Sequence, residues 1–248
     1  MQLDIESHTD KGGRSENEDT TLLKQEDGFV LAAVADGLGG HGGGKIASLC
    51  AAQSLLDHED QLKTMEEDAL RAVCARVNEA VLARQTAQTR MKTTLALALI
   101  AKESFALLHI GDSRTYLFRE GKIVYQSQDH SVSQLAVLTG AIKPEQIRFH
   151  EDRNKVLRSL GSENNATPDI RIFDEPLHPG DAILLCTDGF WEYVTEREML
   201  GTLRRAKNAE DWLKRMKALV QRRAKKDNDN NSALVILAQG PAKKMTWR

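Results

Sequence analysis

Several features that would place this chain in a special class of protein are scarce among its 248 residues. Aromatic residues make up only 5%, and the three cysteines, Cys50, Cys74 and Cys186, all lie within apolar segments. An odd number of cysteines in apolar surroundings indicates small buried side chains and not a disulfide framework. The chain is therefore expected to fold around an apolar core, which a domain of this length can bury without a disulfide or a structural metal.

Long apolar runs and an excess of positive charge are also missing. The longest strictly apolar runs, Phe29–Ala35 and Leu95–Ala101, are far shorter than the roughly 20 residues of a membrane span. The first ten residues are mostly polar and contain no apolar signal region. The 34 Lys and Arg nearly balance the 36 Asp and Glu, which disfavours a basic nucleic-acid binder. We therefore expect a soluble cytoplasmic protein that binds neither membranes nor nucleic acid.

No repeat and no linker rich in Pro, Gly or Ser divides the chain, so we predict one domain over residues 1–240 and a short tail at 241–248. The predicted strands cluster between pairs of helices, which favours an α+β fold with antiparallel sheets flanked by helices. Strands are predicted at 20–24, 29–35, 93–101, 104–110, 115–119, 122–126, 182–186 and 233–238. Helices are predicted at 45–57, 60–87, 131–138, 194–206 and 209–224.

Three local patterns suggest other functions. The glycine run beginning at Gly37 matches a dinucleotide fingerprint, but no second strand follows the helix, and Ile46 replaces the hydroxyl residue that a P-loop needs. The run beginning at Asp227 resembles a calcium loop, but Ala238 replaces its bidentate glutamate. Residues 197–226 hold 11 basic and 3 acidic residues. We interpret them as the solvated face of two helices, with docking of an anionic partner as the alternative.

The pattern that points to chemistry is a set of carboxylates beside glycine or asparagine at the ends of apolar strands. These carboxylates belong to Glu18, Asp36, Asp112, Asp188 and Asp229. An Asp at the end of a buried strand is costly unless it is paired or binds a cation. A single such residue can simply cap a turn, but several in one domain favour a site for Mg²⁺ or Mn²⁺, which prefer oxygen ligands.

Other residues near these carboxylates suggest a phosphoryl substrate. A site with two ions lowers the pKa of water and holds a phosphoryl group. Arg14, four residues before Glu18, is placed to bind phosphate with two hydrogen bonds. His41 is a candidate general acid for the leaving alkoxide, with a loop histidine bonded to the main chain as the alternative. His109, on an apolar strand, is interpreted as a core or supporting residue.

Seven short motifs, in this order along the chain, resemble those of the metal-dependent Ser/Thr protein phosphatases, the PPM family or type 2C, in their compact bacterial form. They are R-x-x-N-E-D at Arg14, A-D-G-L-G-G-H at Ala35, G-D-S-R at Gly111, D-H-S at Asp129, L-x-x-x-G at Leu157, C-T-D-G at Cys186 and D-N-x-S at Asp229. Each motif is weak alone, but the ordered set spans residues 8 to about 238.

The resemblance implies a four-layer α/β/β/α sandwich of two antiparallel sheets flanked by helix pairs. It implies hydrolysis of phosphoserine and phosphothreonine in proteins, reversing the action of a cognate Ser/Thr kinase. It also implies two tightly bound Mn²⁺ or Mg²⁺ ions and a third, weaker ion. We expect the protein to be a monomer.

The resemblance also assigns residue roles. Asp36 would bridge two ions, and the carbonyl of Gly37 would bind one of them. Asp188 and Asp229 would hold the first ion. Glu18 would serve the second, partly through water. Arg14 would grip phosphate, Asp112 would bind the third ion with help from Asp188, and Asp19 would support the ligands.

Some positions depart from the family pattern or leave alternatives open. Lys45 stands where Glu is usual, and Lys92 stands where Gly usually precedes the Thr93-Thr94 pair. Either change can alter local geometry or substrate preference. The polar segment 140–154 resembles the mobile flap of the family, and we expect it to be mobile and to govern substrate choice. Two alternative functions are a phosphatase of small metabolites or nucleotides and an inactive binding module with the same fold.

Overall fold

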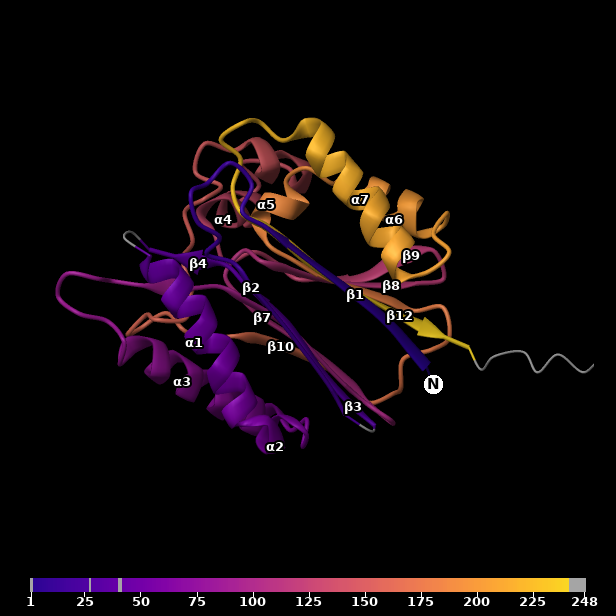
Figure 1. The fold of residues 1–248 in the computed structure, drawn as a ribbon, viewed down its shortest axis with the longest axis horizontal. Coiled ribbons are helices and arrows are strands. Elements are labelled where there is room, and N and C mark those ends of the chain that lie inside the picture. Colours follow the sequence, from indigo (N-terminus) through magenta and orange to yellow (C-terminus); the bar gives the residue numbers. More distant parts are fainter. Residues whose placement is uncertain (1, 27, 40–41, 241–248) are drawn as a thin grey trace, which may run out of the picture.

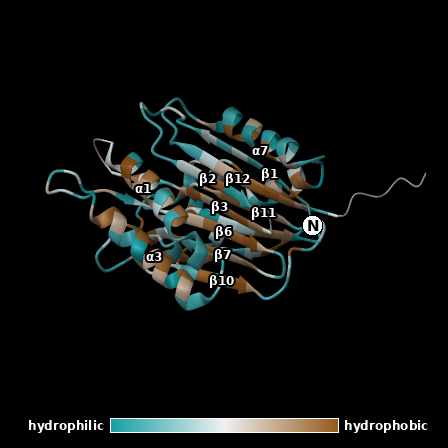
Figure 2. Cartoon of the chain, turned by 60° about the horizontal axis from the view of Figure 1, so that its bottom comes forward, coloured by the Kyte–Doolittle hydropathy of each residue, from teal (hydrophilic) through white to brown (hydrophobic). Residues whose placement is uncertain are grey.

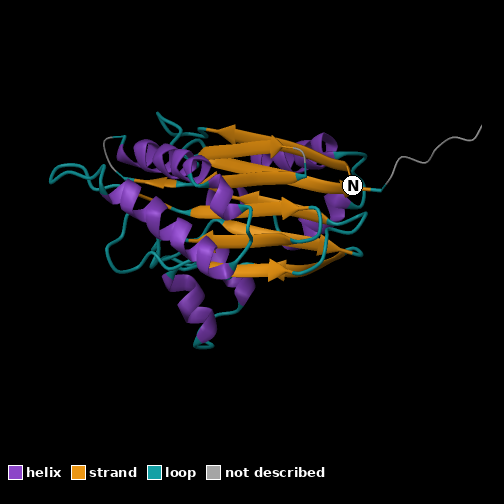
Figure 3. Cartoon of the chain, turned by 90° about the horizontal axis from the view of Figure 1, so that it is seen from below, coloured by secondary structure: helices purple, strands orange, loops and turns teal. Residues whose placement is uncertain are grey.

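The computed structural model describes residues 2–26, 28–39 and 42–240. Two antiparallel sheets of five strands pack face to face, and helices cover their outer faces (Figures 1 and 3). The first sheet has the order β1 (Gln2–Asp10), β12 (Asn231–Gln239), β11 (Ala182–Cys186), β8 (Arg114–Arg119) and β9 (Lys122–Gln126). The second has the order β10 (Asp169–Phe173), β7 (Phe105–Ile110), β6 (Leu95–Ala101), β3 (Phe29–Ala35) and β2 (Thr20–Glu26). The predicted α/β/β/α sandwich is confirmed.

Helices from the two halves of the chain form the outer layers. The second sheet is covered by α1 (Gly43–Asp57), α2 (Glu59–Leu62) and α3 (Glu67–Leu82). The first is covered by α6 (Glu196–Leu203) and α7 (Ala209–Arg223). Shorter elements complete the fold: the ribbon of β4 (Gly37–Leu38) and β5 (Lys92–Thr93), α4 (Val132–Leu138), the 3₁₀-helix η1 (Pro144–Phe149) and α5 (Asp188–Trp191).

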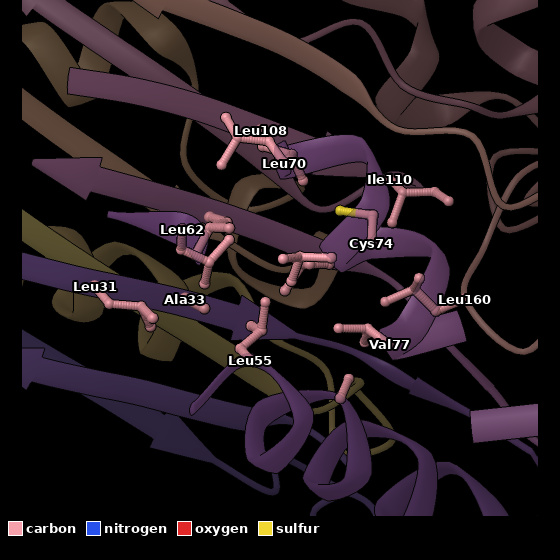
Figure 4. Packing of buried hydrophobic residues seen from close by; sticks show 14 of the residues in the cluster. Leu31, Ala33, Leu55, Leu62, Leu70, Cys74, Val77, Leu108, Ile110 and Leu160 are labelled. Atoms are coloured by element: carbon pink, nitrogen blue, oxygen red, sulfur yellow. The ribbon is translucent and has the colours of Figure 1, made fainter. Parts of the chain in front are cut away.

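Three central strands, β3, β6 and β11, are apolar along their whole length because both of their faces are buried (Figure 2). In β3, Leu31 and Ala33 join the helices in one core, whereas Val30 and Val34 join the core between the sheets. Figure 4 shows how Leu55 of α1 and Val77 of α3 meet side chains of the second sheet in the first of these cores. Because successive side chains of a strand point to opposite faces, a central strand such as β3 packs into two cores.

The structure corrects several predicted boundaries. The helix predicted at 60–87 is two helices, because the chain turns between α2 and α3, where Met65 has a positive φ of 53°. The helix predicted at 194–206 spans only α6. Strands β1 and β10 were not predicted from sequence because both are sheet edges whose side chains are exposed or half-buried, so neither has a continuous apolar run.

The sequence suggested an irregular segment at 140–154, but the structure shows that only part of it is irregular. Its middle forms η1, and Ile147 and Arg148 are buried. Arg148 Nη2 donates to Glu196 Oε1 at 2.7 Å and to the carbonyl of Val194 at 3.2 Å. The buried Ile147 packs in the core between the first sheet and its helices. The segment is therefore anchored to the first-sheet side of the molecule.

The structure contains no helix, within its described residues, that is long and apolar enough to cross a membrane. The predicted tail at 241–248 lies outside the described residues. The three cysteines are free and buried, as predicted.

Candidate metal centre

The predicted ligands meet in one cavity of about 690 Å³ at an end of the sandwich. The strand ends that the sequence singled out come together here: β3 and β11 finish at this end, and β12 starts there. The predicted residues that line the cavity are Arg14, Glu18, Asp36, Gly37, Asp112, Asp188 and Asp229. His41 lies outside the described residues.

Asp36 is held through its main chain by two threonines. Its N–H donates to Thr94 Oγ1 at 2.9 Å, and its carbonyl accepts from Thr93 Oγ1 at 2.8 Å and from the N–H of Thr94 at 2.9 Å. Thr94 Oγ1 is also 2.7 Å from Ser113 Oγ, next to Asp112. Hydrogen bonds therefore connect the two loops that carry Asp36 and Asp112.

Gly37 lies against the first turn of α1 with no room for a side chain. A Cβ on Gly37 would come within 2.1 Å of the carbonyl oxygen of Gly44. Contact at that distance is impossible without backbone movement, so glycine is required where the main chain after Asp36 crosses α1. The close approach leaves the main chain of Gly37 beside the carboxylates.

Glu18 reaches the N-terminus of α1. Burial raises the pKa of Glu18, although hydrogen bonds from the main chain of Lys45 and Gly44 lower it. Lys45, one of the departures from the family pattern, turns its ammonium group to the carbonyl of Asp19 at 2.9 Å. It therefore supports the loop and does not occupy the cavity.

Asp188 and Asp229 are brought together by close packing of α5 on the loop before β12. A Cβ on Gly189 would lie 2.0 Å from the carbonyl oxygen of Asn230, so this contact requires glycine. The side chain of Asn230 accepts from the N–H of Glu18 and donates to the carbonyls of Lys11 and Glu16. One asparagine thus fixes the loop of Glu18 against the loop of Asp229.

Asp19 accepts hydrogen bonds from residues close to Asp188 and Asp229 in sequence, and its support of the metal ligands stays a prediction. Its Oδ2 accepts from Thr187 Oγ1 at 3.0 Å and from Ser232 Oγ at 2.7 Å, while its buried Oδ1 has no partner among the described residues. Burial raises the pKa of Asp19 to about 7.

The electrostatics of the cavity fit a divalent cation. Burial, together with repulsion from Asp19, Asp188 and Asp112, raises the pKa of Asp36 well above its usual value. Burial raises the pKa of Asp188 to about 6. Burial and mutual repulsion make the ionised form of these carboxylates unfavourable, and a bound cation would offset that cost. An all-oxygen donor set is the kind that Mg²⁺ and Mn²⁺ take.

Asp112 is more buried than the other four proposed carboxylate ligands. Its side chain is buried, and burial and repulsion from Asp188 raise its pKa well above the usual value. The indole N–H of Trp191 donates to its carbonyl at 2.9 Å, which fixes the turn after β7. Asp112 therefore lies within the electrostatic reach of Asp188, as the predicted third site requires.

Arg14 is the cation that contacts this cluster in the described part of the chain. Its Nε and Nη2 donate to Asp229 Oδ1 and Oδ2 at 3.0 and 2.9 Å. The side chain of Arg14 is 55% exposed and lines the cavity, so its guanidinium group is accessible to an anion there.

The remaining motifs surround the site. Asp129 pairs with the buried Arg114, which stacks on Trp191 at 3.5 Å. His130 Nδ1 accepts from the main-chain N–H of Gly111 at 3.2 Å, and the main-chain N–H of His130 donates to the Gly111 carbonyl at 2.8 Å. His109 is buried with its Nε2 2.8 Å from the carbonyl of Gln128, in agreement with its interpretation as a core or supporting residue.

Sequence reasoning missed Glu192. It lines a smaller cavity of about 200 Å³ together with Asp188, and burial and the charge of Asp188 raise its pKa to about 7. Arg153 donates to it at 2.8 Å. The signal was the spacing of four residues from Asp188 to Glu192, which places both on one face of a helix.

The family model of protein phosphatase 2C matches residues 6–235. The Serine/threonine phosphatase stp of Listeria welshimeri is 34% identical over 207 residues, which cover 79% of this chain and 81% of that protein.

Solved structures agree with the fold. The crystal structure of the Mycobacterium tuberculosis serine/threonine phosphatase PstP matches with a TM-score of 0.79 and 30% identity, covering 96% of this chain and 99% of that one. A structure of the catalytic domain of PstP in complex with two manganese ions matches with the same TM-score and identity.

Proposed function

Because the chain belongs to the protein phosphatase 2C family, we propose that it hydrolyses phosphoserine and phosphothreonine in proteins at the cavity around Asp36. The observation that carries the proposal is the meeting in one cavity of five carboxylates from five separate motifs, together with Arg14 from the motif of Glu18. The raised pKa values of the buried carboxylates support a cation-binding role for the cluster.

Two Mn²⁺ or Mg²⁺ ions bound here would lower the pKa of water and offset negative charge on the phosphoryl group. We assign Asp36 as a residue that would serve both ions, with the carbonyl of Gly37 beside it. Asp188 and Asp229 would hold the first ion, and Glu18 would serve the second. Asp112, together with Asp188, would hold a third and weaker ion.

Arg14 binds the phosphoryl oxygens in this proposal. The planar guanidinium group can offer two parallel N–H donors to a phosphate, in the manner in which it contacts Asp229 in this structure. When Asp229 serves as a metal ligand, Arg14 would have both of these donors free for the substrate. His41 stays the candidate donor of a proton to the leaving hydroxyl of serine or threonine.

The test is phosphate release from a phosphothreonine peptide with Mn²⁺, with Mg²⁺ and after exhaustive chelation. We expect turnover with either ion and none after chelation, with recovery when the ion is restored. Peptide turnover far above that of free nucleotides supports a protein substrate. Full activity after chelation, or faster turnover of nucleotides, contradicts the proposal.

Phosphoprotein substrates imply a Ser/Thr kinase that produces them, and we propose such a kinase as the functional counterpart. A monomer in the cytoplasm stays our prediction for the state and location of the protein. The buried, free cysteines are typical of a reducing compartment and support that location.

A further inference from the structure

A second cavity, of about 670 Å³, lies beside the metal centre and has no part in the proposed reaction. It is bounded by the end of α3, the loop that follows, strand β5 and residues from Leu157 to Asn165. Its volume is close to that of the metal-centre cavity, so it can hold a side chain and its neighbouring main chain.

The two cavities share a thin wall. Leu38 lines the metal-centre cavity and pairs across the β4–β5 ribbon with Lys92, which lines the second cavity. On the other side, Val156 lines the first cavity and the next residue, Leu157, lines the second. A chain bound at the metal centre therefore reaches the second cavity by crossing one two-residue ribbon.

The second cavity presents positive charge. Thr93 turns inward to bond the carbonyl of Asp36, so the alternation of the strand turns Lys92 outward. Arg90 and Lys92 are exposed, and in the described part of the chain neither side chain makes an ion pair or hydrogen bond. Glu163 is the single acid among the described lining residues, which leaves the lining net positive.

Resting on the proposed function, we propose that this second cavity binds an acidic side chain of the phosphoprotein substrate. Lys92 pairs with Leu38 across the β4–β5 ribbon, and Leu38 lies two residues after Asp36. Standard strand spacings therefore place the Cα of Lys92 about 8 Å from the Cα of Asp36. An extended peptide covers about 8 Å in two to three residues. The acidic residue therefore lies two to three positions from the phosphorylated residue.

Positive charge in the second cavity would offset the repulsion between an acidic substrate and the carboxylates of the metal centre. The metal centre is built from carboxylates, and an acidic substrate approaching it meets their repulsion wherever no ion neutralises them. Arg90 and Lys92 offer unpaired positive charge next to that cluster. Substrates with acidic flanking residues are thereby favoured over neutral ones.

The experiment compares phosphothreonine peptides that carry Glu, Gln or Lys at the second and third positions on either side of the phosphothreonine. For the wild-type protein with Mn²⁺, we expect the best Glu peptide to have a KM about fivefold below its Gln counterpart, since each exposed ion pair contributes modestly. The preference should vanish toward 1 M salt, where the screening length is about 3 Å.

Charge reversal identifies the residues. The double variant Arg90→Glu, Lys92→Glu should lose the Glu preference and favour the Lys peptide, while the neutral variant Lys92→Gln should lose part of it. The matched control is Lys102→Glu, an exposed lysine after β6 at the opposite end of that strand from Thr94, which should keep the wild-type preference.

Equal KM values for Glu and Gln peptides in the wild type, or a Glu preference that survives in the double variant, overturn the inference. Failure of the wild-type protein to hydrolyse any of the peptides is a different result, because it refutes the proposed function on which the inference rests.

Discussion

The contact between Arg14 and Asp229 joins two residues that have different proposed roles. Their two hydrogen bonds, at 3.0 and 2.9 Å, join a proposed phosphate ligand to a proposed metal ligand. Both side chains are partly exposed, so solvent screens the pair and its contribution to folding is small. The arginine is therefore available for substrate at little cost in stability.

The variant Arg14→Ala should raise the KM for a phosphothreonine peptide. A charge-assisted hydrogen bond contributes about 1.5–3 kcal/mol, so kcat/KM should fall roughly 10- to 100-fold. Steady-state kinetics with Mn²⁺ measures the change, and Arg71→Ala, which removes an exposed ion pair on α3, is the control. An unchanged KM with metal binding intact would move the phosphate site elsewhere.

Asp36→Asn tests the shared ligand. Removing its charge should weaken ion binding and lower kcat by about 100-fold or more, because both proposed ions depend on it. In chelator the variant should be at least as stable as the wild type, since one of several mutually repelling carboxylates is gone. Calorimetric Mn²⁺ titration, kinetics and urea unfolding measure the three effects. Near-normal turnover would refute the assignment.

Asp112→Ala tests the third ion. Asp112 is separate from the ligands assigned to the two tight ions, so those should still bind. We expect kcat to fall about tenfold, because the weak ion contributes to catalysis and not to the fold. Mn²⁺ titration alongside kcat measures both effects. A variant that loses stability but keeps its kcat would show that Asp112 only fixes the turn after β7.

At the scale of elements, the anchored segment 140–154 connects the metal-centre end of the molecule with α6 and the loop before α6. The buried side chain of Arg148 holds this segment in place. It donates hydrogen bonds to Glu196 and to the carbonyl of Val194, and it lies 5.3 Å from the ring of Trp191. Glu196 also accepts from Arg114, so it keeps a partner when Arg148 is removed.

Arg148→Ala should release this segment without unfolding the sandwich. Hydrogen exchange in residues 140–154 should accelerate, while exchange in β3, β6, β11 and β12 should stay slow. The cost in stability should be about 2 kcal/mol, because two hydrogen bonds and a stacking contact are lost. Acceleration across the whole domain would mean that Arg148 holds the fold and not only the segment. Arg171→Ala, an arginine on the edge strand β10, serves as control.

Elements differ in how far the sequence predicts them. Apolar runs such as Phe29–Ala35 and Ala182–Cys186 predicted central strands with correct ends, because burial on both faces leaves no polar alternation. The edge strand β1 escaped prediction, since its pairing with β12 decides its structure more than its own composition does. The turn at Met65 also has no clear local signal.

The same contrast holds at the site. A single Asp beside a glycine at a strand end is visible in the sequence, and the structure brings the predicted carboxylates into one cavity. The bonds that hold them are not visible, because they join residues far apart in the chain. Asn230 binding the loop of Glu18 and Thr94 linking Asp36 to Ser113 are two such cases.

At the scale of the whole molecule, the crowded carboxylates make the metal-free protein sensitive to pH. Burial raises the folded-state pKa of Asp19 to about 7 and that of Asp36 well above its usual value. A raised carboxyl pKa contributes stability at low pH that is lost as pH rises through the folded value. Burial lowers the pKa of His109 to about 4, so His109 acts in the opposite direction, but only below about pH 6.5.

In chelator, the free energy of unfolding should therefore fall by about 1–2 kcal/mol between about pH 6.5 and pH 8. Mn²⁺ should stabilise the protein at both values, and more strongly at pH 8, because protons no longer compete for the ligands. Urea unfolding with and without Mn²⁺ measures both effects. Stability in chelator that rises over this interval, or a Mn²⁺ effect that is larger at pH 6.5, would contradict the expectation.

The two open sheets leave four edge strands, and each carries a feature that opposes lateral growth. Strands β1, β2 and β10 place charged side chains along their edges: Asp4 and Glu6, Lys24 and Glu26, and Asp169 and Arg171. Strand β9 begins at Lys122 and meets β8 with a register shift near Phe118. Because charges and irregular pairing disfavour the addition of a foreign strand, amyloid-like aggregation through the folded sheets is disfavoured, and we expect it to require prior unfolding.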